Sequence, residues 1–183
     1  MNVRDRVIAA VKELACERGL NDITVDEMAA GAGISKRTLY RYFGSKEGVI
    51  EAVLDSVIEE LTQEIRSLVD REKDIAGVLT GAIRYILQNG KFIINAGFIS
   101  DLKQRYPQLW SKIERIRAEN IRWLVQVMAG RGDPVIRDLD PRILTACVTA
   151  SIQAVLNPDF LLANNLTVEE AAVQLQRFLL RSF

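Results

Sequence analysis

The sequence contains no histidine, only two cysteines, and no apolar run long enough to cross a membrane. Without histidine it lacks the commonest zinc ligand, the commonest general base and every Ser-His or Cys-His catalytic arrangement. No phosphate-binding loop or metal-ligand spacing occurs either. The sequence therefore argues against an enzyme and predicts neither a cofactor nor a metal, although Asp, Glu, Lys and Cys side chains remain as chemical groups.

The cysteines and the apolar segments indicate where the chain resides. Cys16 and Cys147 form no CxxC pair, so we expect two small buried residues in a reducing compartment. The longest uncharged stretch, Ile143–Pro158, has 16 residues, whereas a membrane span needs roughly 20 apolar ones. Val7–Val11 is too short for the core of a signal peptide. We expect a cytoplasmic protein without membrane contact.

The composition is that of an ordinary folded protein. The 183 residues are 49% hydrophobic and 26% charged, which suits one domain of moderate size or two small ones. The 24 basic and 24 acidic residues balance to a net charge of zero. Any preference for nucleic acid must therefore come from a local accumulation of charge.

Residues 24–46 contain two short predicted helices joined by a glycine-bearing turn. Thr24 and Glu27 form a capping box at the start of the first helix. The turn follows at Ala30-Gly31-Ala32-Gly33, and Ser35 is placed to cap the second helix. This spacing is typical of a helix-turn-helix unit.

The second of these helices has a basic outer face. At 100° per residue, Leu39 and Phe43 share an inward face, while Arg37 and Arg41 fall about 160° and about 200° from Leu39. Arg can donate two hydrogen bonds to guanine, so such a helix suits the DNA major groove. The alternative is a solvated basic helix within a helical bundle.

The run ITVDEMAAGAGISKRTLYRYFGSKEGVIEAVL, within residues 6–54, resembles the DNA-binding domain of the TetR family of transcriptional regulators. The resemblance implies an all-helical homodimer that a small molecule releases from DNA. By position, it implies backbone-phosphate contacts for Thr24, Ser35, Tyr40, Tyr42 and Lys46, and base contacts for Lys36, Arg37, Thr38 and Arg41. The family often has glycine at the position of Arg37 and Tyr or His at that of Arg41, so the operator sequence does not follow from a relative.

The remaining chain predicts an all-α fold of about nine helices. Apolar periodicity continues for over 20 residues from Lys46, which predicts a long fourth helix. That helix would join a DNA-binding domain, residues 1–48, to a larger ligand-binding and dimerisation domain, residues 49–183. It could also be a long core helix without a signalling role.

The last two expected helices are candidates for a dimer interface. The eighth runs from Pro141 to about Asn157 and is apolar nearly all round, so it should be covered on most sides. The ninth follows the Thr167–Glu170 capping box and continues to the C-terminus. Two copies of this pair would form an intermolecular four-helix bundle. Alternatively, both helices fill the core of a monomer.

Aromatic residues in the second domain are candidates for an effector pocket. A small apolar or aromatic ligand would fit between helices that carry them, although each could equally be ordinary core. Arg122, Gln126 and Asn95 are candidate polar contacts. The expected function is a ligand-responsive regulator of a pseudo-palindromic operator, or a DNA-binding regulator whose second domain only dimerises or binds a protein partner. The candidate aromatic residues are Tyr85, Phe92, Phe98, Trp110 and Trp123.

Overall fold

The computed structural model describes residues 2–18, 20, 22–89 and 96–181 of the chain. Its described part is helical, with no strand among those residues. The helices are α1 (Val3–Arg18), α2 (Val25–Gly31), α3 (Lys36–Phe43), α4 (Lys46–Arg71), α5 (Ile75–Asn89), α6 (Ala96–Arg105), α7 (Pro107–Gly130), α8 (Pro141–Val155), α9 (Pro158–Ala163) and α10 (Val168–Arg181). The all-α prediction is confirmed.

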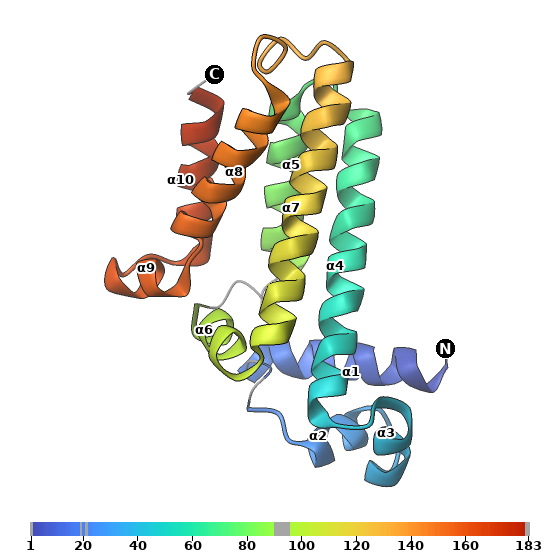
Figure 1. Cartoon of the computed structure of the whole chain (residues 1–183). Helices are drawn as coiled ribbons and strands as arrows, with labels where there is room; N and C mark the ends of the chain where they lie inside the picture. Colours follow the sequence, from blue (N-terminus) through green and yellow to red (C-terminus); the bar gives the residue numbers. More distant parts are fainter. Residues whose placement is uncertain (1, 19, 21, 90–95, 182–183) are drawn as a thin grey trace.

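Three short helices and the start of a long one form the N-terminal unit. In Figure 1, α1 crosses the base of α4, and α2 and α3 lie at the extreme end of the molecule. Val11 of α1, Leu39 of α3 and Ile50 of α4 are fully buried in one core. Leu102 of α6 and Leu109 of α7 belong to the same core, so the N-terminal unit packs directly against the rest of the chain.

Helix α4 joins this core to a second one. It has 26 residues, which corresponds to roughly 39 Å of helix. It starts at the Ser45 cap, and its buried residues lie near both ends, from Val49 to Leu54 and at Leu68 and Val69. Figure 1 shows α4 and α7 side by side along most of their length. The expectation of a long fourth helix is confirmed.

The second core lies where α4 ends and α5, α7 and α8 meet. Val78, Met128 and Ile136 are fully or almost fully buried there. Asp133, only 2% exposed, fixes the adjoining loop. One of its carboxylate oxygens accepts from the backbone N–H of Ile75 at 2.7 Å, and the other accepts from that of Val135 at 2.9 Å. The start of α5 is thereby anchored to the loop before α8.

The end of the chain differs from the expectation in one element. A short helix, α9, lies between the two expected last helices, which are α8 and α10. Asn157 caps it by accepting from the N–H of Asp159 at 3.0 Å, and Pro158 occupies its first position. The Asn-Pro pair therefore ends one helix and starts another.

Two expectations about burial are wrong for the single chain. Helix α8 is not covered on most sides, because Ile143 is 65% exposed. Cys16 and Cys147 are both exposed, not buried. Cys147 lies on the same side of α8 as Ile143, one helical turn further on. Both residues therefore belong to one apolar face that the chain itself leaves uncovered.

Candidate nucleic-acid interface and ligand cavity

The α2–turn–α3 segment is held by the caps that the sequence predicts. Thr24 Oγ1 accepts from the N–H of Glu27 at 3.2 Å, and the Glu27 carboxylate accepts from the N–H of Thr24 at 2.8 Å. Gly33 has a φ of 63°, a conformation that glycine adopts without strain. Ser35 Oγ accepts from the N–H of Thr38 at 3.1 Å and starts α3. The local sequence thus sets the angle between the two helices.

Helix α3 presents its arginines away from the core. Leu39 is fully buried, and Phe43 packs against the same core with the Arg4 guanidinium 5.6 Å from its ring centroid. Arg37 and Arg41 are exposed, as the helical periodicity predicts. The guanidinium of Arg41 lies 5.5 Å from the centroid of the Tyr42 ring. This leaves an outward surface that can meet a groove of DNA.

One cation of α3 has an acidic neighbour. Lys36 Nζ lies 3.1 Å from a carboxylate oxygen of Asp26 in α2, and both side chains are exposed. The two residues are ten positions apart and meet because the turn brings α2 alongside α3. The free protein therefore compensates part of the positive charge at the start of α3.

The remaining expected DNA contacts lie around the same helix. Tyr40 and Tyr42 are 41% and 48% exposed. Thr38 is half-buried, and its hydroxyl lies 2.9 Å from that of Ser35. Lys46 is half-buried in the first turn of α4. The structure therefore brings all nine expected residues, from Thr24 to Lys46, to one end of the molecule.

Gly48 was missed by sequence reasoning and holds α3 against α4. Gly44 ends α3 with a φ of 76°, and Ser45 Oγ caps α4 by accepting from the N–H of Gly48 at 3.0 Å. A Cβ at position 48 would clash with the carbonyl oxygen of Phe43. Only glycine permits this close approach, so Gly48 sets the angle at which α3 leaves the long helix.

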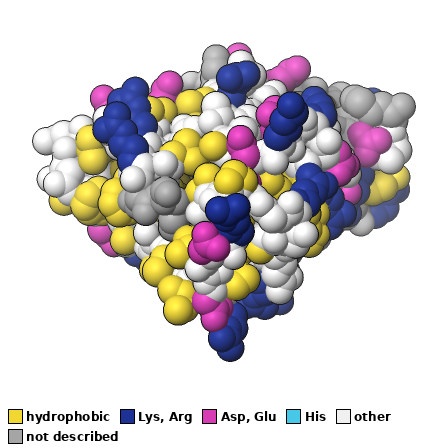
Figure 2. Space-filling view, turned by 90° about the horizontal axis from the view of Figure 1, so that it is seen from above, with side chains coloured by type: hydrophobic (Ala, Val, Ile, Leu, Met, Phe, Trp, Pro, Cys, Tyr) yellow, Lys and Arg dark blue, Asp and Glu magenta, His cyan; other side chains and the backbone are white. Residues whose placement is uncertain are grey.

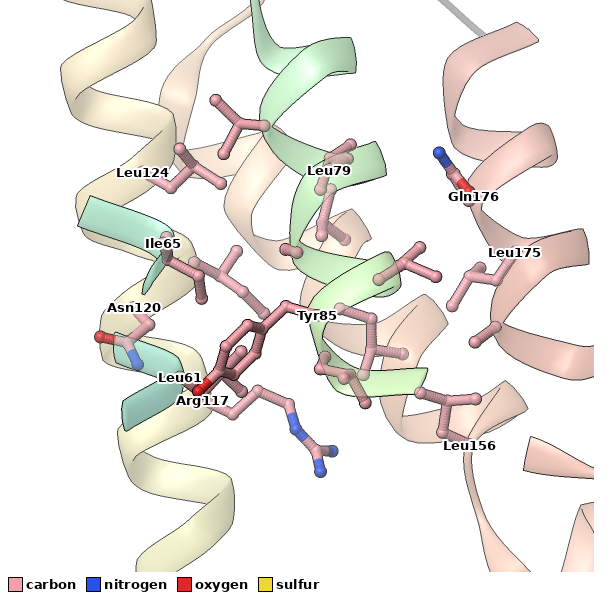
Figure 3. Close-up of a pocket in the computed structure, with 18 of the residues that line it drawn as sticks. Leu61, Ile65, Leu79, Tyr85, Arg117, Asn120, Leu124, Leu156, Leu175 and Gln176 are labelled. Atoms are coloured by element: carbon pink, nitrogen blue, oxygen red, sulfur yellow. The ribbon is translucent and has the colours of Figure 1, made fainter. Parts of the chain in front are cut away.

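A cavity of about 360 Å³ lies further along α4. Its walls come mainly from α4, α5, α7, α8 and α10, with two residues of α6. Figure 3 shows leucine and isoleucine side chains around it, among them Leu61 and Ile65 of α4, Leu79 of α5 and Leu175 of α10. The lining is nearly all aliphatic, which suits an apolar ligand.

The polar groups of the cavity include a tyrosine with a perturbed hydroxyl. Burial raises the pKa of Tyr85, and the nearby carboxylates of Glu60 and Glu64 raise it further. Figure 3 shows the Tyr85 ring extending from α5 towards Asn120 and Arg117 of α7. Arg117 is paired with Glu114 at 2.6 Å. Burial lowers the pKa of Arg117 despite that partner.

The aromatic residues expected in the pocket divide into three groups. Tyr85 and Trp110 line the cavity. Trp123 does not, because it packs in the second core with the Arg66 guanidinium 5.8 Å from its ring centroid. Phe92 and the side chain of Phe98 lie outside the described residues.

None of the polar residues that the sequence suggests as ligand contacts is placed in the cavity by the described part of the structure. Arg122 and Gln126 line a separate groove between α7 and α8, so their assignment to the cavity is wrong. Asn95 lies outside the described residues. Sequence reasoning missed Asn120, Arg117 and Gln176, for which helical periodicity gives no signal apart from their apolar neighbours.

The capped helix pair, its exposed basic helix and the all-helical body define a helix-turn-helix DNA-binding protein. Residues 7–53 match the model of the family described as "Bacterial regulatory proteins, tetR family". The match identifies residues 7–53 as a DNA-binding domain of the TetR type.

Similar proteins extend the likeness beyond the N-terminal unit. The regulator YvaF of Bacillus subtilis, described as an uncharacterised HTH-type transcriptional regulator, is 27% identical over 166 residues, which cover 90% of this chain and 87% of that protein. The structure of FadR from Bacillus halodurans, a fatty acid degradation regulator, matches with a TM-score of 0.68 at 18% identity, covering 98% and 95% of the two chains. RolR in complex with resorcinol matches with a TM-score of 0.61 at 21% identity, covering 96% and 86%. At these identities the two structures establish the shared fold.

Among the residues that the structure describes, no group of three or more Cys, Asp or Glu side chains is arranged to hold a metal ion. Within the same ranges, no helix is long and apolar enough to span a bilayer.

Proposed function

We propose that this chain is a transcriptional repressor that binds a pseudo-palindromic operator as a homodimer and is released by a small-molecule effector. The observation that carries the proposal is the exposed basic face of α3, backed by the buried Leu39, at one end of the molecule. Two such helices, one in each protomer, would enter successive major grooves about one helical turn apart. Residues 1–48 form the DNA-binding domain in this proposal, and residues 49–183 bind the effector and dimerise.

The proposed DNA contacts divide into two classes. Lys36, Arg37, Thr38 and Arg41 project from α3 and meet base edges. The phosphate backbone is contacted by Thr24, Ser35, Tyr40, Tyr42 and Lys46. The exposure of both arginines supports the first class, and the position of the others at the same end of the molecule supports the second.

The proposed dimer uses α8 and α10, which correspond to the last two helices that the sequence predicts. Their outer faces carry exposed apolar side chains, with Ile143 65% exposed and Phe178 60% exposed. Ala146, Cys147, Ala150 and Ala154 continue the exposed face along α8. Small residues allow two helices to approach closely, so this face suits packing against its own copy.

The effector would act through α4, which is in contact with both functional regions. Glu60 of α4 lines the cavity, and its carboxylate lies 2.6 Å from Nζ of Lys12 in α1. Lys112 of α7 lies between Glu51 and Asp55 of α4, at 2.9 and 2.7 Å. A ligand that moves α4 would therefore move the DNA-binding unit. Such a ligand can shift the equilibrium between the DNA-binding and released conformations only as far as its affinities for the two conformations differ. The resorcinol complex of RolR supports a small-molecule role for this fold.

Selection of bound sites from randomised duplexes tests the proposal. We expect an inverted repeat to be enriched, and its affinity to fall steeply with salt because phosphate contacts release counterions. The absence of any sequence preference at moderate salt would contradict the DNA assignment. A thermal-shift screen then separates an effector-binding regulator from one whose second domain only dimerises or binds a protein partner, which no small molecule would stabilise.

A further inference from the structure

The polar groups of the cavity are few, and most of them lie towards α4 and α7. Figure 3 shows the Tyr85 ring reaching from α5 to the side where Asn120 and Arg117 lie, with Leu156, Leu175 and Gln176 on the other side. The Gln176 amide there already donates to the Thr80 hydroxyl at 2.7 Å. Between these two sides the described lining is made mainly of Leu, Ile and Val. A ligand that fills this space would thus be aliphatic for most of its length and polar at one end.

Both charged side chains in the described lining already have partners. The Arg117 guanidinium lies 2.6 Å from a Glu114 oxygen and stacks over the Trp110 ring at 5.9 Å. The second oxygen of Glu114 accepts from the Gln153 amide at 2.8 Å. The Glu60 carboxylate is paired with Lys12 at 2.6 Å. An anionic head would have to share Arg117 with Glu114, whose carboxylate already compensates its charge.

The charges around Tyr85 also oppose an anion. Glu60 and Glu64 are close enough to raise the pKa of its hydroxyl, and they would repel a carboxylate placed beside it. Transferring an unpaired carboxylate into an apolar cavity costs far more than transferring a hydroxyl that finds hydrogen-bond partners. The charge distribution therefore favours a neutral head.

Two uncharged groups match such a head. The Tyr85 hydroxyl can both donate and accept a hydrogen bond. The Asn120 amide donates to the Thr62 hydroxyl at 3.0 Å, so its carbonyl oxygen is the group that it offers to a ligand as an acceptor. A ligand hydroxyl could accept from one residue and donate to the other.

We propose that the effector is an uncharged aliphatic compound with a single hydroxyl head, and that Tyr85 determines the preference for this head over a carboxylate. This inference rests on the proposed function of the cavity as the effector site.

Calorimetric titration of the full chain with 1-decanol and with decanoate tests the inference at neutral pH. We expect decanol to bind roughly tenfold tighter or more. Tyr85→Phe should weaken decanol binding by roughly two- to tenfold, as the loss of a neutral hydrogen bond does, and should leave decanoate unchanged. Tyr106→Phe removes the same hydroxyl from a half-buried tyrosine that does not line the cavity, and should change neither affinity.

Decanoate binding as tightly as decanol would overturn the inference, most clearly if Arg117→Gln then abolished the decanoate affinity. An unchanged decanol affinity in Tyr85→Phe would overturn the role of Tyr85. Failure of both probes to bind would overturn the ligand class, while selected operator binding would still stand. Release of the selected duplex is followed in the same samples. Decanol that binds without releasing DNA would contradict the proposed effector function and leave the ligand class intact.

Discussion

Arg37 and Arg41 are the side chains on which sequence preference should depend most directly. Both are exposed on the outer face of α3, opposite the buried Leu39. Replacing either by alanine should cost about 1–3 kcal/mol at one base pair of the selected operator and relax the preference there. The measurement is the affinity for a panel of duplexes with single base changes.

Lys46→Ala is the matched comparison, because its proposed contact is with the phosphate backbone. The affinity of this variant should fall alike for all duplexes. The slope of log affinity against log salt should decrease in magnitude by about one. A uniform loss in the arginine variants as well would show that the division between base and backbone contacts is wrong.

Asp26 is expected to restrain DNA binding through Lys36. The two exposed side chains lie 3.1 Å apart, and such a pair contributes little to folding. Asp26→Asn removes an exposed acid beside α3 and releases Lys36. We expect affinity for any duplex to rise by up to about fivefold at low salt, with the gain shrinking as salt increases. Asp22→Asn, at an exposed acid in the connection before α2, is the control. An equal rise in both variants would mean that the local pairing is irrelevant.

The junction of α3 with α4 does not tolerate added volume at position 48. Gly48→Ala improves helix propensity, but its Cβ would clash with the Phe43 carbonyl oxygen, and overpacking of this kind typically costs about 1–3 kcal/mol. We expect a lower free energy of unfolding in chemical denaturation. Gly130→Ala, at the end of α7, places its Cβ in open space and should be neutral or slightly stabilising. If the two variants were equally stable, the close approach of residue 48 to the Phe43 carbonyl oxygen would be refuted.

Helix limits could be predicted from the sequence because they depend on neighbouring residues. The Thr24 and Ser35 caps each act within one turn of helix, and the structure has them where they were expected. The basic face of α3 follows equally from local periodicity. The Lys36–Asp26 ion pair could not be predicted from local periodicity, because it forms between two helices.

The cavity lining could not be predicted in the same way, because it depends on how whole helices are rotated. Trp110 and Trp123 both occupy apolar positions of α7, but they are separated by about 220° around the helix. Only Trp110 faces the cavity, while Trp123 packs in the second core. Which face of α7 turns towards α4 and α5 is settled by packing between distant segments, and one sequence does not contain that information.

The distribution of exposed side chains over the molecule points to assembly through one side. Figure 2, which views the molecule from the end opposite α2 and α3, shows basic and acidic side chains interspersed, with hydrophobic ones gathered towards the side of α8 and α10. Ile143, Phe160, Leu162 and Phe178 are each at least 42% exposed. The expectation that α8 would be covered on most sides is wrong for one chain, but a second copy would supply that cover.

Ile143→Glu tests this assembly, because it places a charge within a proposed apolar interface while the side chain is already 65% exposed in the single chain. The chain should keep its fold, since Ile143 belongs to none of its cores, whereas the dimer should dissociate under the cost of burying an unpaired carboxylate. Sedimentation velocity would then show a monomer, and affinity for the full inverted repeat should fall towards that for a half-site, because the two recognition helices would no longer bind as a unit. Gln88→Glu adds the same charge to the exposed side of α5 and should leave both the dimer and operator affinity intact. If Ile143→Glu remained dimeric with an unchanged circular dichroism spectrum, the two protomers would have to meet through a surface other than α8 and α10.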